Sequence, residues 1–228
     1  NENGYPIGYF FGYKAIGVFQ TQEEIDSYIS PATGKPIQPN AAPGDTKFED
    51  LNGDGVISDD NEDRTMIGKP NPDWMVGLTV AADWNGFDLS AFFQGSFGAD
   101  VFDALRRYEL AAVNYTSDAL ERWTGPGTSN SMPRIVLGDT PKNFRPSTLL
   151  VHDASFLRLR NLQVGYTLPA QLTRKAYIQR LRFYASFDNL LTITGYKGMD
   201  PEIGSTMGID KGVYPQARVY TFGLNLTF

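Results

Sequence analysis

Residues 220–228 read YTFGLNLTF, and this stretch decides the fold. Large apolar side chains occupy every second position, and small or polar side chains stand between them. Successive side chains of a β-strand point to opposite faces of a sheet, so the stretch predicts a strand with one wholly apolar face. The apolar positions are Tyr220, Phe222, Leu224, Leu226 and Phe228. A soluble β-sandwich can contain such a strand, so this stretch alone does not identify the architecture. The other strands and the lengths of the connections between them are needed as well.

Four further stretches alternate in the same way and predict strands at residues 74–83, 87–97, 154–167 and 181–189. Between the first two, Asn85 and Gly86 favour the positive φ angles of a two-residue hairpin. Within residues 154–167 the apolar positions change from odd to even numbers partway. This change predicts a β-bulge near Arg160 and Asn161, because an extra residue in one strand restores the common face.

The connections between these strands alternate between long and short. Long ones precede residue 74 and cover about 98–153 and 190–215, whereas those after residues 84 and 167 are short. Outer-membrane barrels have this pattern, with short periplasmic turns and long extracellular loops. We therefore predict an extended, extracellular loop region at 1–73 and the last barrel strands at 74–228. Helical turns are expected at 22–28 and a helix at 103–123.

Composition excludes several classes of protein. The 228 residues contain no cysteine and one histidine, His152, so thiolate metal sites, disulfide scaffolds and histidine-based catalytic sites lack their ligands or partners. No run of 18 apolar residues predicts a membrane-spanning helix. A net charge of −6 argues against nucleic acid as a partner. Since a closed transmembrane barrel needs at least about eight strands, we expect an all-β chain that is the carboxy-terminal part of a larger barrel.

Residues 50–58, DLNGDGVIS, match the first half of an EF-hand calcium loop. Oxygen ligands stand at positions 1, 3 and 5, and position 7 offers a backbone carbonyl. Position 12 holds Asn61 rather than an acid, so the last ligand is open between Asp59, Glu62 and Asp63. The predicted site, structural rather than catalytic, comprises Asp50, Asn52, Asp54, Val56, Asp59 and Asp63. The alternative is a solvated acidic turn held by Asx hydrogen bonds.

Neighbouring acids such as Asp59 and Asp60 do not predict a glycosidase, because its two carboxylates must lie on opposite sides of a sugar. We therefore expect no enzyme activity. Aromatic residues fall into two groups. Trp74, Trp84, Phe97 and Phe228 lie near strand ends, as in the interfacial girdles of barrels. Tyr108, Tyr115, Trp123 and Tyr196 lie in loops, where they could stack on a sugar or contact a partner protein.

An ordered set of motifs resembles the SusC/RagA-like TonB-dependent transporters over essentially the whole chain. The motifs include YKAIGVFQTQEEI (13–25), PGD (43–45), DLNGDGVI (50–57), DRTMIG (63–68), PNP (70–72), RW (122–123), FLRLRN (156–161), DNLLTITGY (188–196) and MDPE (199–202). The resemblance implies a plugged outer-membrane barrel of about 22 strands in a Gram-negative cell. It also implies energisation by TonB through an amino-terminal part outside this sequence.

The same resemblance implies a SusD-like surface lipoprotein as a lid, outer-membrane lipid as surroundings, and glycans or peptides as cargo. Residues 220–228 then carry the carboxy-terminal signal read by the barrel-assembly machinery. The alternative is a secreted, soluble, calcium-stabilised β-sandwich that serves as a binding or adhesion module.

Overall fold

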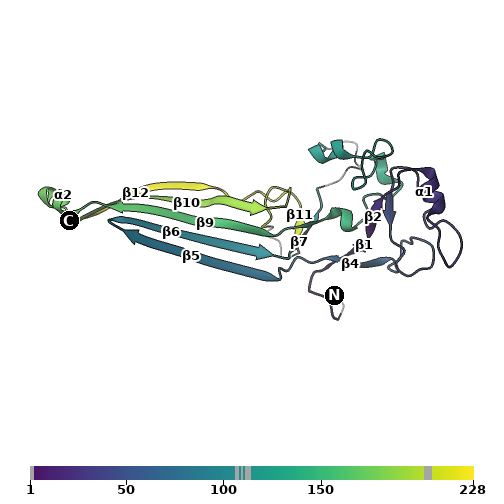
Figure 1. Cartoon of the computed structure of the whole chain (residues 1–228), viewed down its shortest axis with the longest axis horizontal. Helices are drawn as coiled ribbons and strands as arrows, with labels where there is room; N and C mark the ends of the chain where they lie inside the picture. Colours follow the sequence, from purple (N-terminus) through teal and green to yellow (C-terminus); the bar gives the residue numbers. More distant parts are fainter. Residues whose placement is uncertain (1–2, 106–107, 109, 111–113, 203–206) are drawn as a thin grey trace. The chain divides into compact units, whose positions relative to one another are not determined.

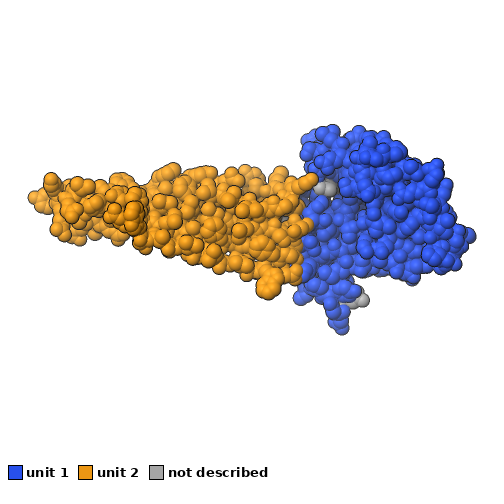
Figure 2. Space-filling view, in the orientation of Figure 1, with its two compact units in different colours: residues 1–71, 100–152, 203–212 blue, residues 72–99, 153–202, 213–228 orange. Residues whose placement is uncertain are grey.

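The computed structural model describes residues 3–105, 108, 110, 114–202 and 207–228. The chain divides into two compact units, which Figure 2 colours separately. Unit 1 comprises residues 1–71, 100–152 and 203–212, and unit 2 comprises residues 72–99, 153–202 and 213–228. The helices among the described residues are too short, or not apolar enough, to cross a membrane.

Unit 2 is built on one antiparallel sheet of five long strands (Figure 1). In spatial order they are β12 (Val219–Thr227), β10 (Arg180–Thr194), β9 (Phe156–Thr167), β6 (Phe87–Phe97) and β5 (Trp74–Trp84). The predicted strands are thus all present, and β10 continues five residues beyond its predicted end. Strands of 9 to 15 residues are long enough to cross a bilayer, for which about 9–11 tilted residues suffice.

The short connections of this sheet follow from local sequence. Asn85 and Gly86 join β5 to β6 with φ angles of 49° and 87°, as a two-residue hairpin requires. The connection from β9 to β10 contains the helix α2 (Ala170–Thr173) and a 3₁₀ turn, Arg174–Ala176, after Pro169. These segments carry the chain from each strand directly to its neighbour.

The predicted bulge in β9 is confirmed. Opposite β6, the register passes from Phe92↔Asn161 to Phe93↔Leu159, which leaves Arg160 as the extra residue. Opposite β10, the register is interrupted at Asn189, whose φ of 52° is left-handed. The bulge keeps the apolar positions of β9 on one face of the sheet along its whole length.

Unit 1 contains short strands and irregular segments. β1 (Phe10–Tyr13) pairs with β4 (Arg64–Gly68), and β2 (Ala15–Val18) pairs with β3 (Thr46–Phe48), both antiparallel. A third sheet has the order β11 (Ile209–Asp210), β7 (Asp100–Asp103), β8 (Val151–Asp153). Three 3₁₀ segments, Ser117–Glu121, Leu137–Asp139 and Thr148–Leu150, lie in the long connection between β7 and β8.

The helical turns predicted at 22–28 are present as α1 (Gln22–Ser27). The Thr21 hydroxyl accepts the Glu24 amide at 3.3 Å, the carboxylate of Glu24 accepts the Gln20 amide at 2.8 Å, and Ile25 is buried. These bonds satisfy amides that a helix start leaves unpaired.

The longer helix predicted at 103–123 is wrong for the described residues, which form the end of β7, irregular backbone and the 3₁₀ segment Ser117–Glu121. Residues 106, 107, 109 and 111–113 lie outside the description. Tyr108 and Ala119 pack with Met132 in a small cluster of this connection. In proteins, most of the stability of a helix comes from packing of its apolar face. Here the apolar side chains pack in this cluster without a continuous helix.

Candidate functional site

The sheet of unit 2 has one continuous apolar face. Cross-strand pairing aligns rows such as Val80, Ala91, Leu162, Phe187 and Tyr220 from β5 to β12. The side chains on this face are largely exposed, with Trp84 at 76% and Phe222 at 75%. A contiguous apolar face of this kind marks a surface that lipid or protein covers.

The opposite face of the sheet carries the charged and amide side chains of these strands, with a few apolar ones such as Met75 and Phe92 among them. Arg182 donates to the Asp88 carboxylate, with the Nε–oxygen distance at 2.8 Å. The Asn161 amide donates to the Ser186 hydroxyl at 3.1 Å and to the Asp188 carboxylate at 2.7 Å. The polar side chains therefore bond to one another across the strands, as they do where the face of a sheet lines an aqueous interior.

The polar face also carries an ionic cluster that we term the arginine clamp: Arg158 and Asp200, which are buried, and Arg160 and Glu202, which are partly exposed. Arg158 donates to Asp200 at 2.6 Å and to Glu202 at 3.0 Å, and Arg160 donates to Glu202 at 2.7 Å. The side chains of Arg158 and Asp200 are 3% and 5% exposed. Two positive and two negative charges balance, which a buried cluster requires.

The predicted assembly-signal residues lie on the outer strand β12 or directly after it. Tyr220, Phe222, Leu224 and Leu226 all point to the apolar face, and Phe228 follows the last strand residue. All five side chains are exposed.

The acidic loop is closed by hydrogen bonds from its own backbone. The Asp50 carboxylate accepts the amides of Gly53 at 2.8 Å and Gly55 at 2.9 Å. The Asn52 side-chain oxygen accepts the Asp54 amide at 3.0 Å, and the Asp54 carboxylate accepts the Val56 amide at 2.8 Å. The first three predicted ligands therefore lie together in a series of Asx turns.

The other acidic residues among the predicted ligands have different partners. Asp63 is fully buried and accepts the amides of Leu51 at 3.2 Å and Ser58 at 3.0 Å, so it joins the two halves of the loop. Glu62, the open alternative, accepts the Asn52 side-chain amide at 2.9 Å. Asp59 instead forms an ion pair with Lys142, whose hydrogen bond holds the pKa of this carboxyl below its ordinary value.

No group of three or more His, Cys, Asp or Glu side chains within the described part of the chain is arranged to hold a metal ion. The oxygens of Asp50 and Asp54 are engaged by amides, as they are in the hydrogen-bonded acidic turn that we gave as the alternative. Calcium binding by this loop stays a prediction.

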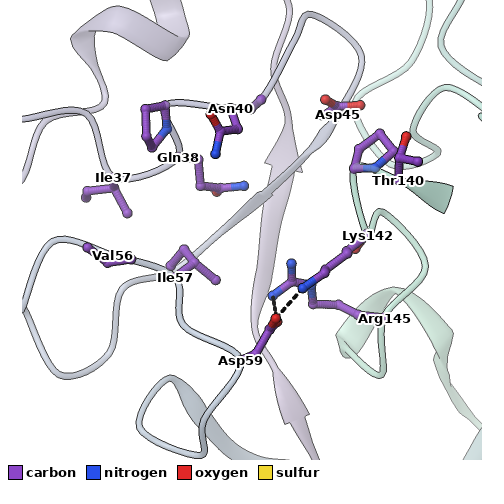
Figure 3. A pocket seen from close by; sticks show the side chains of 13 residues that line it. Ile37, Gln38, Asn40, Asp45, Val56, Ile57, Asp59, Thr140, Lys142 and Arg145 are labelled. Carbon is purple, nitrogen blue, oxygen red and sulfur yellow. Dashed lines mark hydrogen bonds and ion pairs between the residues drawn. The ribbon is translucent and has the colours of Figure 1, made fainter.

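One wall of a cavity in unit 1 is formed by this loop (Figure 3). The cavity measures about 320 Å³, at the lower end of the range for ligand pockets. Ile37 and Ile57 give it an apolar side, and the Asp59–Lys142 pair lies beside Arg145 (Figure 3). The guanidinium of Arg145 stacks on the rings of Tyr13 and Phe48 at 4.6 and 4.9 Å. The arrangement suits a small ligand that has both apolar and hydrogen-bonding groups.

The loop aromatics take part in internal packing. Tyr108 packs against Tyr115 and Phe144, with centroid distances of 5.7 and 5.1 Å. The Trp123 indole donates to the Gln20 side chain at 3.1 Å, and Tyr196 is buried. His152 lies 3.8 Å from Asp103. Among these residues, Tyr115 has an exposed side chain and remains open to an external contact.

Known proteins resemble the chain along its whole length, although no family model matches it. The solved structure of the RagAB peptide importer in its open-open state superposes on 99% of the chain with a TM-score of 0.71 and 25% identity. TonB-dependent receptor P3 of Formosa agariphila is 34% identical over 238 aligned residues, which include 100% of the chain. TonB-dependent receptor SusC of Bacteroides thetaiotaomicron is 31% identical over 95% of the chain. The chain is a segment of a SusC/RagA-like TonB-dependent transporter.

The segment spans about a quarter of the length of these relatives. It covers 23% of receptor P3, 20% of SusC and 23% of the RagAB importer chain. The antiparallel sheet is thus part of a transporter barrel, as predicted, and the β-sandwich alternative is wrong. The relatives are named as receptors and importers, in agreement with the expectation of no enzyme activity.

Sequence reasoning missed two features of this transporter segment. The arginine clamp joins FLRLRN (156–161) to MDPE (199–202), two motifs that were recognised separately. The two arginines of the first motif and the two acids of the second were a signal for an ion pair. Whether these side chains contact one another depends on how the connection after β10 folds onto the sheet. The cavity was missed because its walls come from segments about 100 residues apart.

Proposed function

We propose that this segment forms part of the wall of an outer-membrane importer, with the apolar face of its sheet against lipid and the polar face towards the interior. The observation that carries the proposal is that one face is apolar along β5, β6, β9, β10 and β12, whereas the charged and amide side chains of these strands gather on the other face. A transmembrane barrel needs this separation, because its outside meets hydrocarbon and its interior meets water. The similarity to TonB-dependent receptors, which extends over 95–100% of this chain, supports the proposal.

We further propose that the complete transporter takes up oligosaccharides or peptides with a SusD-like lipoprotein lid and draws energy from TonB through residues outside this segment. The similarity to SusC and to the RagAB peptide importer supports a partnered importer.

Within this proposal, the acidic loop binds calcium in a structural role. The EF-hand spacing of Asp50, Asn52 and Asp54 supports it, as does the Val56 carbonyl at position 7. The candidates for the last ligand are Glu62, which already contacts Asn52, and Asp63. Asp59 is the weakest candidate because it is paired with Lys142.

Arginine substitutions on the two faces of β5 test the orientation of the wall. Val80 lies on the apolar face, and its neighbour Thr79 lies on the polar face, opposite Phe92. In the full-length transporter folded into lipid vesicles, Val80→Arg should lower the free energy of unfolding by about 2–4 kcal/mol, because a charge at the lipid midplane destabilises the barrel. Thr79→Arg is the matched control and should cost much less. Urea titrations give both values, and equal costs would contradict the proposed orientation.

A further inference from the structure

The arginine clamp ties a connection of the chain onto the polar face of the sheet. Arg158 stands in the row Gln94↔Arg158↔Thr192, so its side chain leaves the sheet on the polar side. Its Nε donates to the Thr192 hydroxyl at 2.9 Å, which fixes the plane of the guanidinium. The remaining nitrogens reach Asp200 and Glu202, which belong to the connection that follows β10. The strand wall therefore holds this connection through buried charge.

The extra residue of the bulge adds a second arginine to the same cluster. Arg160 donates to the side chains of Gln94 at 2.6 Å and Asn189 at 3.2 Å, and to Glu202. Without the bulge, successive residues would alternate between faces, and the side chains at 160 and 161 could not both serve the polar face. The bulge thus delivers Arg160 and Asn161 together to this face.

Both flanks of the connection are held at once. Besides Arg158, the Asp200 carboxylate accepts the amides of Glu202 at 2.9 Å and Gln216 at 3.0 Å. The side-chain amide of Asn189 donates to the Ala217 carbonyl at 3.0 Å. Residues 195–202, which leave β10, and 213–218, which enter β12, are therefore fastened to each other and to the wall.

The Asp200 carboxylate of the clamp stays charged at neutral pH. Burial alone would raise the pKa of Asp200, but the amides of Gln216 and Glu202 together with the Arg158 guanidinium outweigh it and hold this pKa below its ordinary value. Arginine stays protonated in proteins. Neither partner can release the other by an ordinary change of pH near 7.

We propose that the arginine clamp makes residues 195–202 and 213–218 a strap on the polar face of the sheet, and that holding this strap in place is required for passage of cargo. The proposal rests on the proposed function for its second part, because only there does the polar face line the route of the cargo. Its first part concerns the fold alone.

Protease accessibility tests the strap in the full-length transporter. Asp200→Asn keeps the size of the side chain but leaves the Arg158 charge without its nearest partner. Breaking a buried ion pair is strongly destabilising, so trypsin cleavage after Lys197 and Arg218 should accelerate by at least about tenfold. Asp88→Asn is the matched control, because it breaks the pair with Arg182 on the same face but touches no strap residue. Asp88→Asn should leave both cleavage rates unchanged.

Heat-modifiable migration on gels shows whether the barrel of Asp200→Asn is folded. If it is folded and the cleavage rates are unchanged, the proposal of a strap is overturned. Glu202→Gln provides a second, milder variant should Asp200→Asn fail to fold, and it should accelerate cleavage in the same direction. Cargo uptake by cells is measured separately. Uptake that falls several-fold in the clamp variants but not in Asp88→Asn supports the second part, and unaltered uptake with faster cleavage overturns that part alone. If no cargo is transported even by the parent, the proposed function fails while the cleavage result stands.

Discussion

At the scale of single residues, Gly44 shows how a short motif secures a loop. Its φ is 91°, a left-handed value that favours glycine, and its carbonyl accepts the Arg134 amide at 2.8 Å. The next residue, Asp45, is buried and accepts two bonds from the Arg134 guanidinium, at 2.6 and 3.1 Å. A Cβ at Gly44 would lie only 2.9 Å from two carbons of the Trp123 ring. The glycine therefore serves backbone conformation and close packing together.

A comparison of two glycines separates these contributions. Gly44→Ala should destabilise unit 1 by about 2–4 kcal/mol, combining the left-handed backbone cost with overpacking against Trp123. Gly34 also has a positive φ, 68°, but nothing lies within 4 Å of its added Cβ. Gly34→Ala should therefore cost only about 1–2 kcal/mol. Hydrogen exchange of the Arg134 amide reports the effect of Gly44→Ala. If both variants lose the same free energy of unfolding, packing against Trp123 adds nothing to the cost at Gly44.

At the scale of elements, alternation predicted strands well where the register is simple. β6 was predicted with both of its ends, and the bulge in β9 was visible as a change of parity in one strand. β10 was predicted to end at Asn189, yet it continues to Thr194. Asn189 is left-handed, and Leu191 and Ile193 resume the apolar face after the interruption. Leu191 and Ile193 keep the odd-numbered apolar positions of β10, so the alternation continues past the polar Asn189, at which the prediction ended the strand too early.

The strand β12 carries most of the residues of the predicted assembly signal. Phe228 lies after its last strand residue, so Phe228→Ser removes an aromatic side chain and no ladder pair. In cells, we expect this variant to lower the amount of assembled, heat-modifiable transporter several-fold. Thr227→Ser is the neighbouring control and should leave assembly unchanged. Folding of purified Phe228→Ser into vesicles should stay near the parent value, and a loss of vesicle stability as large as the loss in cells would argue against a signal.

At the scale of the whole molecule, the sequence predicted the sheet, its two faces and its family, but not the contacts between distant segments. The pair Arg158–Asp200 joins residues 42 positions apart, and Lys142–Asp59 joins residues 83 positions apart. Alternation is a local property that one strand reveals by itself. Partners of individual charges depend on the path of the connections, which local patterns do not determine. The predicted calcium site shows the same limit, since Asp59, one of the three candidates for its last ligand, pairs with Lys142 instead.

Calcium removal tests the acidic loop through the stability of the full-length transporter. If the loop binds the ion only when folded, saturation at 100 times the dissociation constant adds about 2.7 kcal/mol. EDTA should therefore lower the melting temperature, and Asp54→Ala should abolish this shift. Glu23→Ala, an exposed acid of α1 outside the loop, should retain it. A melting temperature that does not respond to EDTA would count against calcium.

The order of the strands has a consequence for how such a transporter can be made. Within the described residues, β5 and β12 each have one neighbour in the sheet, so each leaves a row of backbone N–H and C=O groups unpaired. Such rows are templates for further strands. Synthesised alone, the segment offers both templates to other copies of itself and is prone to aggregate. Synthesised beside the rest of the transporter, the same two edges are where further strands pair, so β5 and β12 set the positions of the next strands on either side.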